Sequence, residues 1–214
     1  MTKKASLLRR KRSPPKPLRQ EFRDYARAAI LDAGEAVLAE RGLHLARMEE
    51  VASQARVAVG TIYNLIGDRD ALVVEILALR HRELLKLMAA TVDGVRPLAV
   101  RDQLHGLLVA LLGYFHEHGR FFRLVSESER GAASPHRRQS QETLSEIRRQ
   151  YRELVARGVK QRALRAEGRA LYPGLLMGMM REMVLEALET GSAHGAEDRA
   201  EQIVDLFMLG ASVR

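Results

Sequence analysis

Two short runs of apolar residues at helical spacing, only a few residues apart, most strongly constrain how this 214-residue chain can fold. The first run consists of Met48, Val51, Ala52 and Ala55, and the second of Val57, Ile62 and Leu65. Residues three or four positions apart share one face of a helix, so each short helix can bury its apolar stripe against the other. The pattern predicts a helix-turn-helix, in which the second helix enters the major groove of DNA.

The second helix leaves small, polar and aromatic residues for its outer face, namely Val59, Gly60, Thr61, Tyr63 and Asn64. Gly60 lets another backbone approach closely, and the side chains of Thr61, Tyr63 and Asn64 offer hydrogen-bond donors to phosphate oxygens. The same periodicity also fits an ordinary helical hairpin, or a helix-turn-helix that never contacts DNA. Periodicity alone therefore leaves DNA binding open.

The segments on either side of this motif carry a family resemblance. Upstream, apolar residues recur at helical spacing from Phe22 to Leu38, and the run stops at Arg41 and Gly42. From Tyr25 to about Leu77 the chain resembles the TetR family of bacterial transcriptional regulators. The motifs that carry the resemblance are EEVA at 49–52, VGTIYN at 59–64, and Gly67 followed by Arg69 and Leu72, in the order and spacing of the family.

The resemblance implies an all-α fold, with an N-terminal three-helix head that contains the helix-turn-helix and a C-terminal helical bundle for ligand binding and dimerisation. We expect a basic arm over 1–19, a DNA-binding domain over 20–67, and an effector-binding and dimerisation domain over 68–214 that begins with a connecting helix over 68–90. The implied protein is a dimeric repressor that a small-molecule effector releases from its DNA operator. Its expected location is the cytoplasm.

The DNA-contacting residues follow from the resemblance and from the outer face of the second helix. We expect Tyr63, Asn64 and Arg69 to contact phosphates, Val59, Gly60 and Thr61 to lie against base edges, and Arg47 and Arg56 to reach the DNA backbone.

Some positions depart from the family pattern. Arg56 stands where the turn commonly has glycine, which costs roughly 1–2 kcal/mol if the site is left-handed. Ala58 and Ala46 replace the usual caps of the two helices, each at a cost of roughly 0.5–2 kcal/mol. Leu65 and Ile66 stand in for the usual aromatic pair.

The net charge of +8 is concentrated at the N-terminus. The first 19 residues hold eight of the 35 Lys and Arg residues and no acid, and the remaining 27 basic residues match the 27 Asp and Glu. Pro14, Pro15 and Pro17 favour an extended arm. A basic arm next to a helix-turn-helix predicts a phosphate or minor-groove contact that adds salt-dependent affinity. The alternative is a solubilising terminus. No apolar stretch follows the charges, so we do not expect a signal peptide.

Composition argues against several other functions. Hydrophobic residues make up 46% of the chain and come mostly from Leu, Ala, Val and Met, which favours helices. The absence of cysteine excludes disulfides, thiolate metal sites and a cysteine nucleophile. His116 and His118 are two positions apart and point to different sides of a helix, so we expect no metal there. With no phosphate-binding loop and no nucleophile elbow, we expect neither an enzyme nor a cofactor.

Beyond a loop at 91–97, the apolar periodicity predicts helices over 98–117, 121–129, 135–158, 167–190 and 196–209. Ser134 is placed to cap the third of these and Pro135 to begin it. The last of these is apolar on more than one side, and Gly178 on the one before it permits a close approach of another helix, which together with the resemblance predicts a dimer. The expected interface residues are Leu175, Gly178, Met179, Glu182, Ile203 and Phe207. The alternative is that one of these faces simply packs on the chain's own core.

Polar aromatics and soft methionine side chains gather on the third and fourth of these helices and their neighbours. The candidate effector contacts are Tyr114, Phe122, Tyr151, Tyr172, Met177 and Met180. Such side chains suit a largely apolar ligand, with Tyr151 and Tyr172 each supplying one hydrogen bond. The competing interpretation is that these residues simply belong to the hydrophobic core. The nearby arginines Arg148, Arg149 and Arg181 also allow a ligand with an anionic head group.

A second function from another class also fits the sequence. The chain could be a helical interaction protein with a degenerate helix-turn-helix that binds a protein partner, or that binds DNA only non-specifically through its arm.

Overall fold

The computed structural model describes residues 18–120, 123–124, 137–190 and 195–213. Its elements are α1 (Leu18–Arg41), α2 (Met48–Ala55), α3 (Val59–Leu65), α4 (Arg69–Val95), α5 (Val100–Glu117), α7 (Arg137–Lys160), a short 3-10 helix (Ala166–Gly168), α8 (Tyr172–Thr190) and α9 (Ala196–Ala211). The described residues form no β-strand, apart from an isolated bridge between Leu164 and Ser212. The predicted all-α fold is therefore confirmed.

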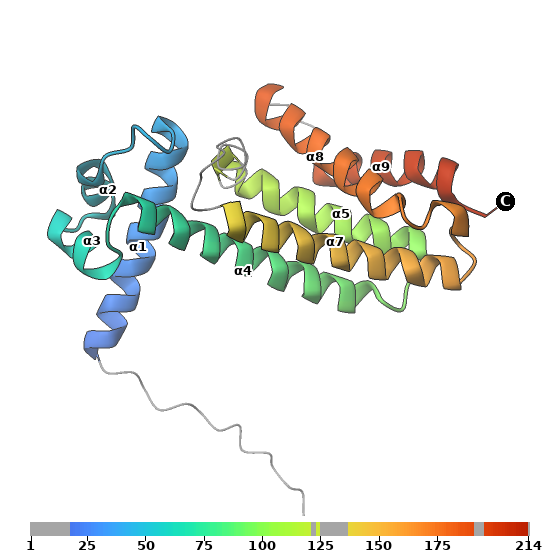
Figure 1. Cartoon of the computed structure of the whole chain (residues 1–214), viewed down its shortest axis with the longest axis horizontal. Coiled ribbons are helices and arrows are strands. Elements are labelled where there is room, and N and C mark those ends of the chain that lie inside the picture. Colours follow the sequence, from blue (N-terminus) through green and yellow to red (C-terminus); the bar gives the residue numbers. More distant parts are fainter. Residues whose placement is uncertain (1–17, 121–122, 125–136, 191–194, 214) are drawn as a thin grey trace, which may run out of the picture.

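Helices α1, α2 and α3 form a head at one end of the molecule, and α5, α7, α8 and α9 pack into a body at the other (Figure 1). Helix α4 begins in the head and runs along the body, so it connects the two parts (Figure 1). A single hydrophobic core extends from Ile30 and Ile62 in the head, through Ile76 of α4, to Leu108 and Val204 in the body. The head is thus fixed to the body by packed side chains.

The sequence explains where the head helices begin and end. Gly42 ends α1 with φ +85°, and its amide donates to the carbonyl of Leu38 at 2.7 Å. Gly34 is buried against α4, where a Cβ would lie 3.0 Å from the side chain of Leu72. The side chain of Asp68 caps α4 by accepting a 2.9 Å hydrogen bond from the amide of Ala71. The bonds at Gly42 and Asp68 fix one end of each helix, and the missing side chain of Gly34 lets α1 and α4 pack closely.

Several predicted boundaries are wrong. Helix α4 continues to Val95, so most of the expected loop at 91–97 is helical. Helix α8 begins at Tyr172 rather than at 167, and α9 continues to Ala211 rather than stopping at 209. Because α1 begins at Leu18, the last two residues of the expected basic arm are helical. The expected helix at 121–129 and the cap at Ser134 and Pro135 lie largely or wholly outside the described residues. None of the described helices is long and apolar enough to cross a membrane.

Candidate nucleic-acid interface

The helix-turn-helix is formed by α2 and α3. Val51 and Ala52 of α2 and Ile62 of α3 are buried, with at most 2% of each exposed. Helix α1 covers the same core, and Arg27 of α1 donates a 2.6 Å hydrogen bond to the carbonyl of Leu65 at the end of α3. Arg27 also pairs with Glu75 of α4. The end of the second helix is therefore bound to α1, and the same arginine binds α1 to α4.

The turn between the two helices is left-handed at Arg56, with φ 56° and ψ 42°. The amide of Arg56 donates to the carbonyl of Ser53 at 3.3 Å, and the amide of Val57 donates to that of Ala52 at 3.0 Å. These two bonds form a Schellman motif, which usually has glycine at the position of Arg56. The sequence alone does not decide whether Arg56 is left-handed, and the structure shows that it is.

The helix caps differ in part from expectation. Ala58 caps α3 without a side-chain hydrogen bond, as its methyl group requires. Helix α2 is capped by Arg47, not by Ala46 as predicted, and Ala46 is buried. The backbone amide of Arg47 donates to the carboxylate of Glu50 at 3.3 Å, which replaces part of the missing cap. Both helices of the motif therefore form, although neither Arg47 nor Ala58 is a usual cap residue.

The expected DNA-contacting residues differ in exposure. Gly60, Asn64, Arg47, Arg56 and Tyr63 are exposed, with 53% of Tyr63 accessible. Val59, Thr61 and Arg69 are half-buried. Among the described residues, no atom outside its own helical turn lies within 4 Å of a Cβ built on Gly60, so that position is open to an approaching surface.

A cleft of about 400 Å³ lies beside α3 and brings three of these residues together. Arg47 comes from the start of α2, Tyr63 from α3 and Arg69 from the start of α4. The cleft is lined by Ala46, Arg47, Met48, Glu49, Tyr63, Asp68, Arg69 and Asp70. Two basic side chains, a phenol and the amino ends of two helices suit the binding of an anion, although three carboxylates share the same walls.

Arg69 also supports the head. Its Nη1 donates to the carbonyl of His44 at 2.6 Å, in the loop before α2. Its buried Nε has no hydrogen-bond partner among the described residues. One side of the guanidinium is therefore occupied by the fold, and only the remaining donors can reach a phosphate.

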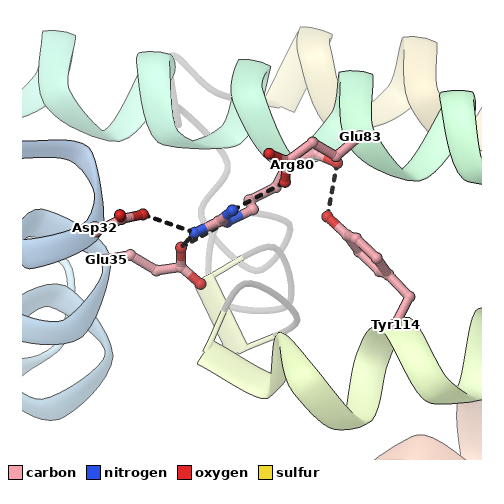
Figure 2. Close-up of polar contacts among 5 residues, drawn as sticks. All are labelled: Asp32, Glu35, Arg80, Glu83 and Tyr114. Carbon is pink, nitrogen blue, oxygen red and sulfur yellow. Dashed lines mark hydrogen bonds and ion pairs between the residues drawn. The ribbon is translucent and has the colours of Figure 1, made fainter. Parts of the chain in front are cut away.

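A cluster of charged residues joins the head to the body around Arg80 of α4, and Figure 2 shows its geometry. Arg80 Nε donates to Glu35 Oε2 at 2.7 Å, Nη1 to Glu83 at 2.9 Å and Nη2 to Asp32 at 3.2 Å. Burial alone would lower the pKa of the Arg80 guanidinium, but the hydrogen bonds to Glu83 and Glu35 outweigh it and raise that pKa above its ordinary value. Sequence reasoning missed this cluster. The available signal was Glu35, a charged residue next to buried apolar positions of α1.

The candidate effector residues lie mostly in the packed core of the body. Tyr151 is fully buried, and its hydroxyl donates to the sulfur of Met180 at 3.7 Å. The ring of Tyr172 packs edge-on against Phe207, with centroids 5.2 Å apart. The hydroxyl of Tyr114 donates to the carbonyl of Arg80 at 2.9 Å.

Burial raises the pKa of the Tyr151 phenol, so this group stays neutral. Met177 is partly buried against the same core, and Phe122 lies outside the described residues. The hydrogen bonds that Tyr151 and Tyr114 make are therefore made within the chain, and their contact with an effector stays a prediction.

The expected interface residues divide into two groups. Leu175, Gly178 and Glu182 of α8 are exposed, and Met179 is half-buried. Ile203 and Phe207 of α9 are at most 5% exposed and belong to the chain's own core, so they cannot serve as surface contacts in this arrangement. The exposed apolar side chains of α9 are instead Leu206 and Leu209, which are 61% and 79% accessible.

Two family models match the sequence. Residues 30–76 match the model of bacterial regulatory proteins of the tetR family. Residues 97–211, more than half of the chain, match the model of the tetracyclin repressor-like C-terminal domain. No curated protein matches this sequence.

Solved structures share the fold over most of the chain. The transcriptional regulator FadR from Bacillus subtilis, in complex with stearoyl-CoA, has a TM-score of 0.74 at 16% identity, covering 86% of this chain and 98% of that one. PfmR from Thermus thermophilus has a TM-score of 0.73 at 20% identity, with coverage of 85% and 97%. The ketosteroid regulator KstR2 of Mycobacterium tuberculosis has a TM-score of 0.71 at 18% identity, with coverage of 88% and 95%.

Proposed function

The chain belongs to the TetR family of bacterial transcriptional regulators, and we propose that it is a dimeric repressor that a small-molecule effector releases from its operator. The observation that carries the DNA-binding part is the cleft beside α3. Arg47, Tyr63 and Arg69 reach it from three different helices. A phosphate oxygen placed there meets two guanidinium groups and one hydroxyl donor.

We expect the contacts to DNA bases to come from the face of α3 next to this cleft. Gly60 is exposed and bears no side chain, so the helix can lie close to base edges, with Val59 and Thr61 on either side. Asn64 and Arg56 are also exposed, and we expect both to reach the DNA backbone. Contacts to phosphate set the position of the head, whereas contacts to base edges select the sequence.

The DNA-binding assignment is tested by fluorescence anisotropy with DNA from upstream of the protein's own gene, with and without unrelated competitor DNA. Tyr63→Ala weakens binding to specific and unrelated DNA by the same factor, because a phosphate contact carries no base information. Tyr25→Ala is the matched control, since Tyr25 is an exposed tyrosine of the head that does not line the cleft. Unchanged affinity of the Tyr63 variant removes the cleft from the interface. Binding that competitor DNA abolishes favours the alternative, an interaction protein that holds DNA only non-specifically.

Dimerisation is proposed through exposed residues of α8 and α9. Leu175, Gly178, Leu206 and Leu209 lie exposed there, and large apolar side chains at a surface gain from burial against a second copy. Two heads held by one dimer read two half-sites, which is how a helix-turn-helix protein obtains operator affinity.

The proposed effector is a largely apolar molecule bound in the body. The B. subtilis FadR structure holds stearoyl-CoA at low identity to this chain, which supports a ligand with a long apolar chain and an anionic head. Because Tyr151, Tyr172 and Met180 are packed as core, such a ligand displaces or repacks them on binding. The flexible thioether of Met180 allows this at small cost.

A thermal-shift series with stearoyl-CoA, stearate, a neutral sterol and a cationic detergent-like amine tests this assignment. Stabilisation by the acyl compounds, followed by release of DNA in the anisotropy assay, supports it. Stabilisation by the cationic compound alone contradicts it.

A further inference from the structure

Arg80 is the point at which the head, the connecting helix and the body meet. Its side chain contacts Glu35 and Asp32 of α1 in the head, and its backbone carbonyl accepts the hydrogen bond from Tyr114 of α5 in the body. Figure 2 shows both contacts, with Asp32 and Glu35 reached by the Arg80 side chain and Tyr114 approaching from α5. One residue of α4 therefore touches the head with its side chain and the body with its backbone.

These contacts are buried. Glu35 is 4% exposed, Tyr114 is 7% exposed and the Arg80 side chain is 13% exposed. Water cannot readily replace a partner that moves away, so a buried carboxylate without its guanidinium carries a large desolvation cost. Glu35 consequently follows Arg80 when α4 moves. Asp32 and Glu83 are more exposed, at 69% and 42% of their side chains, and contribute less.

The end of α5 that carries Tyr114 also contacts its neighbours through a small aromatic group. The ring of Tyr114 lies 5.8 Å from that of Phe115 and 4.4 Å from the imidazole of His118. Just beyond, Arg123 donates to the carbonyl of Ala39 near the end of α1 at 3.1 Å. Arg123 thus contacts α1 directly, about one helical turn from Glu35.

We propose that Tyr114, Arg80 and Glu35 form a coupling link, through which a displacement of α5 in the body changes the orientation of α1 and hence of the DNA-binding head. The proposal rests on the proposed function and assigns its regulation to named residues. Tyr114 acts as a positioning residue: its hydroxyl holds the backbone of α4 at Arg80, and the guanidinium transmits that position to Glu35. A ligand that moves α5 changes the head because the two arrangements differ in these buried contacts.

Hydrogen exchange of the full-length protein, without DNA or ligand, tests the link directly. Tyr114→Phe removes only the hydroxyl, and we expect several-fold faster exchange of the amides of α1 from 32 to 41 and of α2. Tyr151→Phe is the control, because it removes the hydroxyl of another buried tyrosine whose partner is Met180 and not α4. Acceleration confined to α4 and α5, or equal acceleration of the head in both variants, overturns the proposal.

A double-variant cycle then separates a link from two independent effects. Glu35→Gln keeps the shape of the side chain but removes its charge, and Arg80→Lys keeps the charge but loses the forked geometry. Each alone is expected to accelerate exchange in the head. In the Glu35→Gln background, Tyr114→Phe is expected to add less than a twofold change. Full additivity of the two substitutions contradicts coupling.

DNA affinity supplies a second readout. Tyr114→Phe changes affinity for the upstream DNA several-fold with an unaltered salt slope, because the number of phosphate contacts stays the same while the orientation of the head changes. Unchanged affinity together with faster head exchange shows that the link does not reach DNA binding and refutes its regulatory role. If the wild-type protein binds no specific DNA, the proposed function fails while the exchange experiment still decides whether the link exists.

Discussion

The backbone amide of Val57 donates to the carbonyl of Ala52 at 3.0 Å, across the turn that joins the two helices of the DNA-binding motif. This bond requires Arg56, the residue just before Val57, to adopt a left-handed conformation, with φ 56°. That conformation is unfavourable for an L-residue with a Cβ, whereas glycine adopts it freely. The motif therefore keeps its shape at a cost that a glycine at this position would not carry.

Arg56→Gly is expected to stabilise the protein by about 1 kcal/mol, because it relieves the left-handed strain. Urea unfolding followed by circular dichroism measures the change. Arg56→Ala is the matched control, since it removes the charged side chain but retains the Cβ. A gain of the same size in both variants would assign the effect to the missing charge instead of the backbone.

The basic arm is expected to add salt-dependent affinity for DNA. Residues 1–17 hold seven Lys and Arg residues and no acid. Replacing these seven with serine flattens the slope of log K against log salt by up to ~0.9 for each phosphate that the arm neutralises. Anisotropy titrations between low and moderate salt give the slope. Identical slopes for the two proteins mean that the arm is a passive tail.

Gly178→Arg is expected to convert the dimer to monomers and to lower operator affinity. Among the described residues, no atom outside its own helical turn lies within 4 Å of a Cβ built at Gly178, so we expect an arginine there to disturb a second copy and not its own chain. Gly94→Arg is the control, because Gly94 of α4 is also exposed and equally open. Sedimentation equilibrium reports the mass. An intact dimer of the Gly178 variant moves the interface to another surface.

His81 of α4 is expected to make the free energy of unfolding depend on pH. It is 5% exposed, and burial lowers the pKa of its imidazole from 6.5 to about 4. Between these values the unfolded chain binds a proton that the folded chain does not, so stability falls as pH decreases from 6.5 toward 4. His81→Gln does not titrate. When the pH is lowered from 7.5 to 5, the free energy of unfolding should therefore fall by about 2 kcal/mol more for the wild-type protein than for the variant. Urea unfolding at the two pH values measures this difference. Parallel losses would show that His81 is not the group responsible.

Most of the head can be predicted from the sequence because its signals are local. The apolar spacing on α2 and α3, the glycine after Arg41 and the acidic cap at Asp68 each depend on a few neighbouring residues. For the turn at Arg56, the sequence predicts the cost of a left-handed conformation but not whether the residue adopts it, because sequence spacing does not specify a backbone angle.

Two helix boundaries show where local reasoning fails. The residues from Thr91 to Val95 include two valines and a glycine, which favour a loop, yet Val92 is buried and its packing keeps α4 helical. Periodicity alone starts helix α8 too early, although Pro173 marks its first turn. Proline clashes with the carbonyl four residues before it and restricts the preceding residue, so the helix cannot extend far upstream.

The all-α fold, the helix-turn-helix, the asymmetric charge and the family resemblance are all readable in the amino-acid sequence, because each is encoded in local composition and spacing. Tertiary packing was needed to establish that Ile203 and Phe207 face the core while Leu206 and Leu209 remain exposed. Both sides of α9 are apolar, and periodicity shows which residues share a face without showing which neighbour covers it. The contact between Glu35 and Arg80 cannot be predicted from periodicity either, because these residues are 45 positions apart in the chain and meet only when α1 packs on α4.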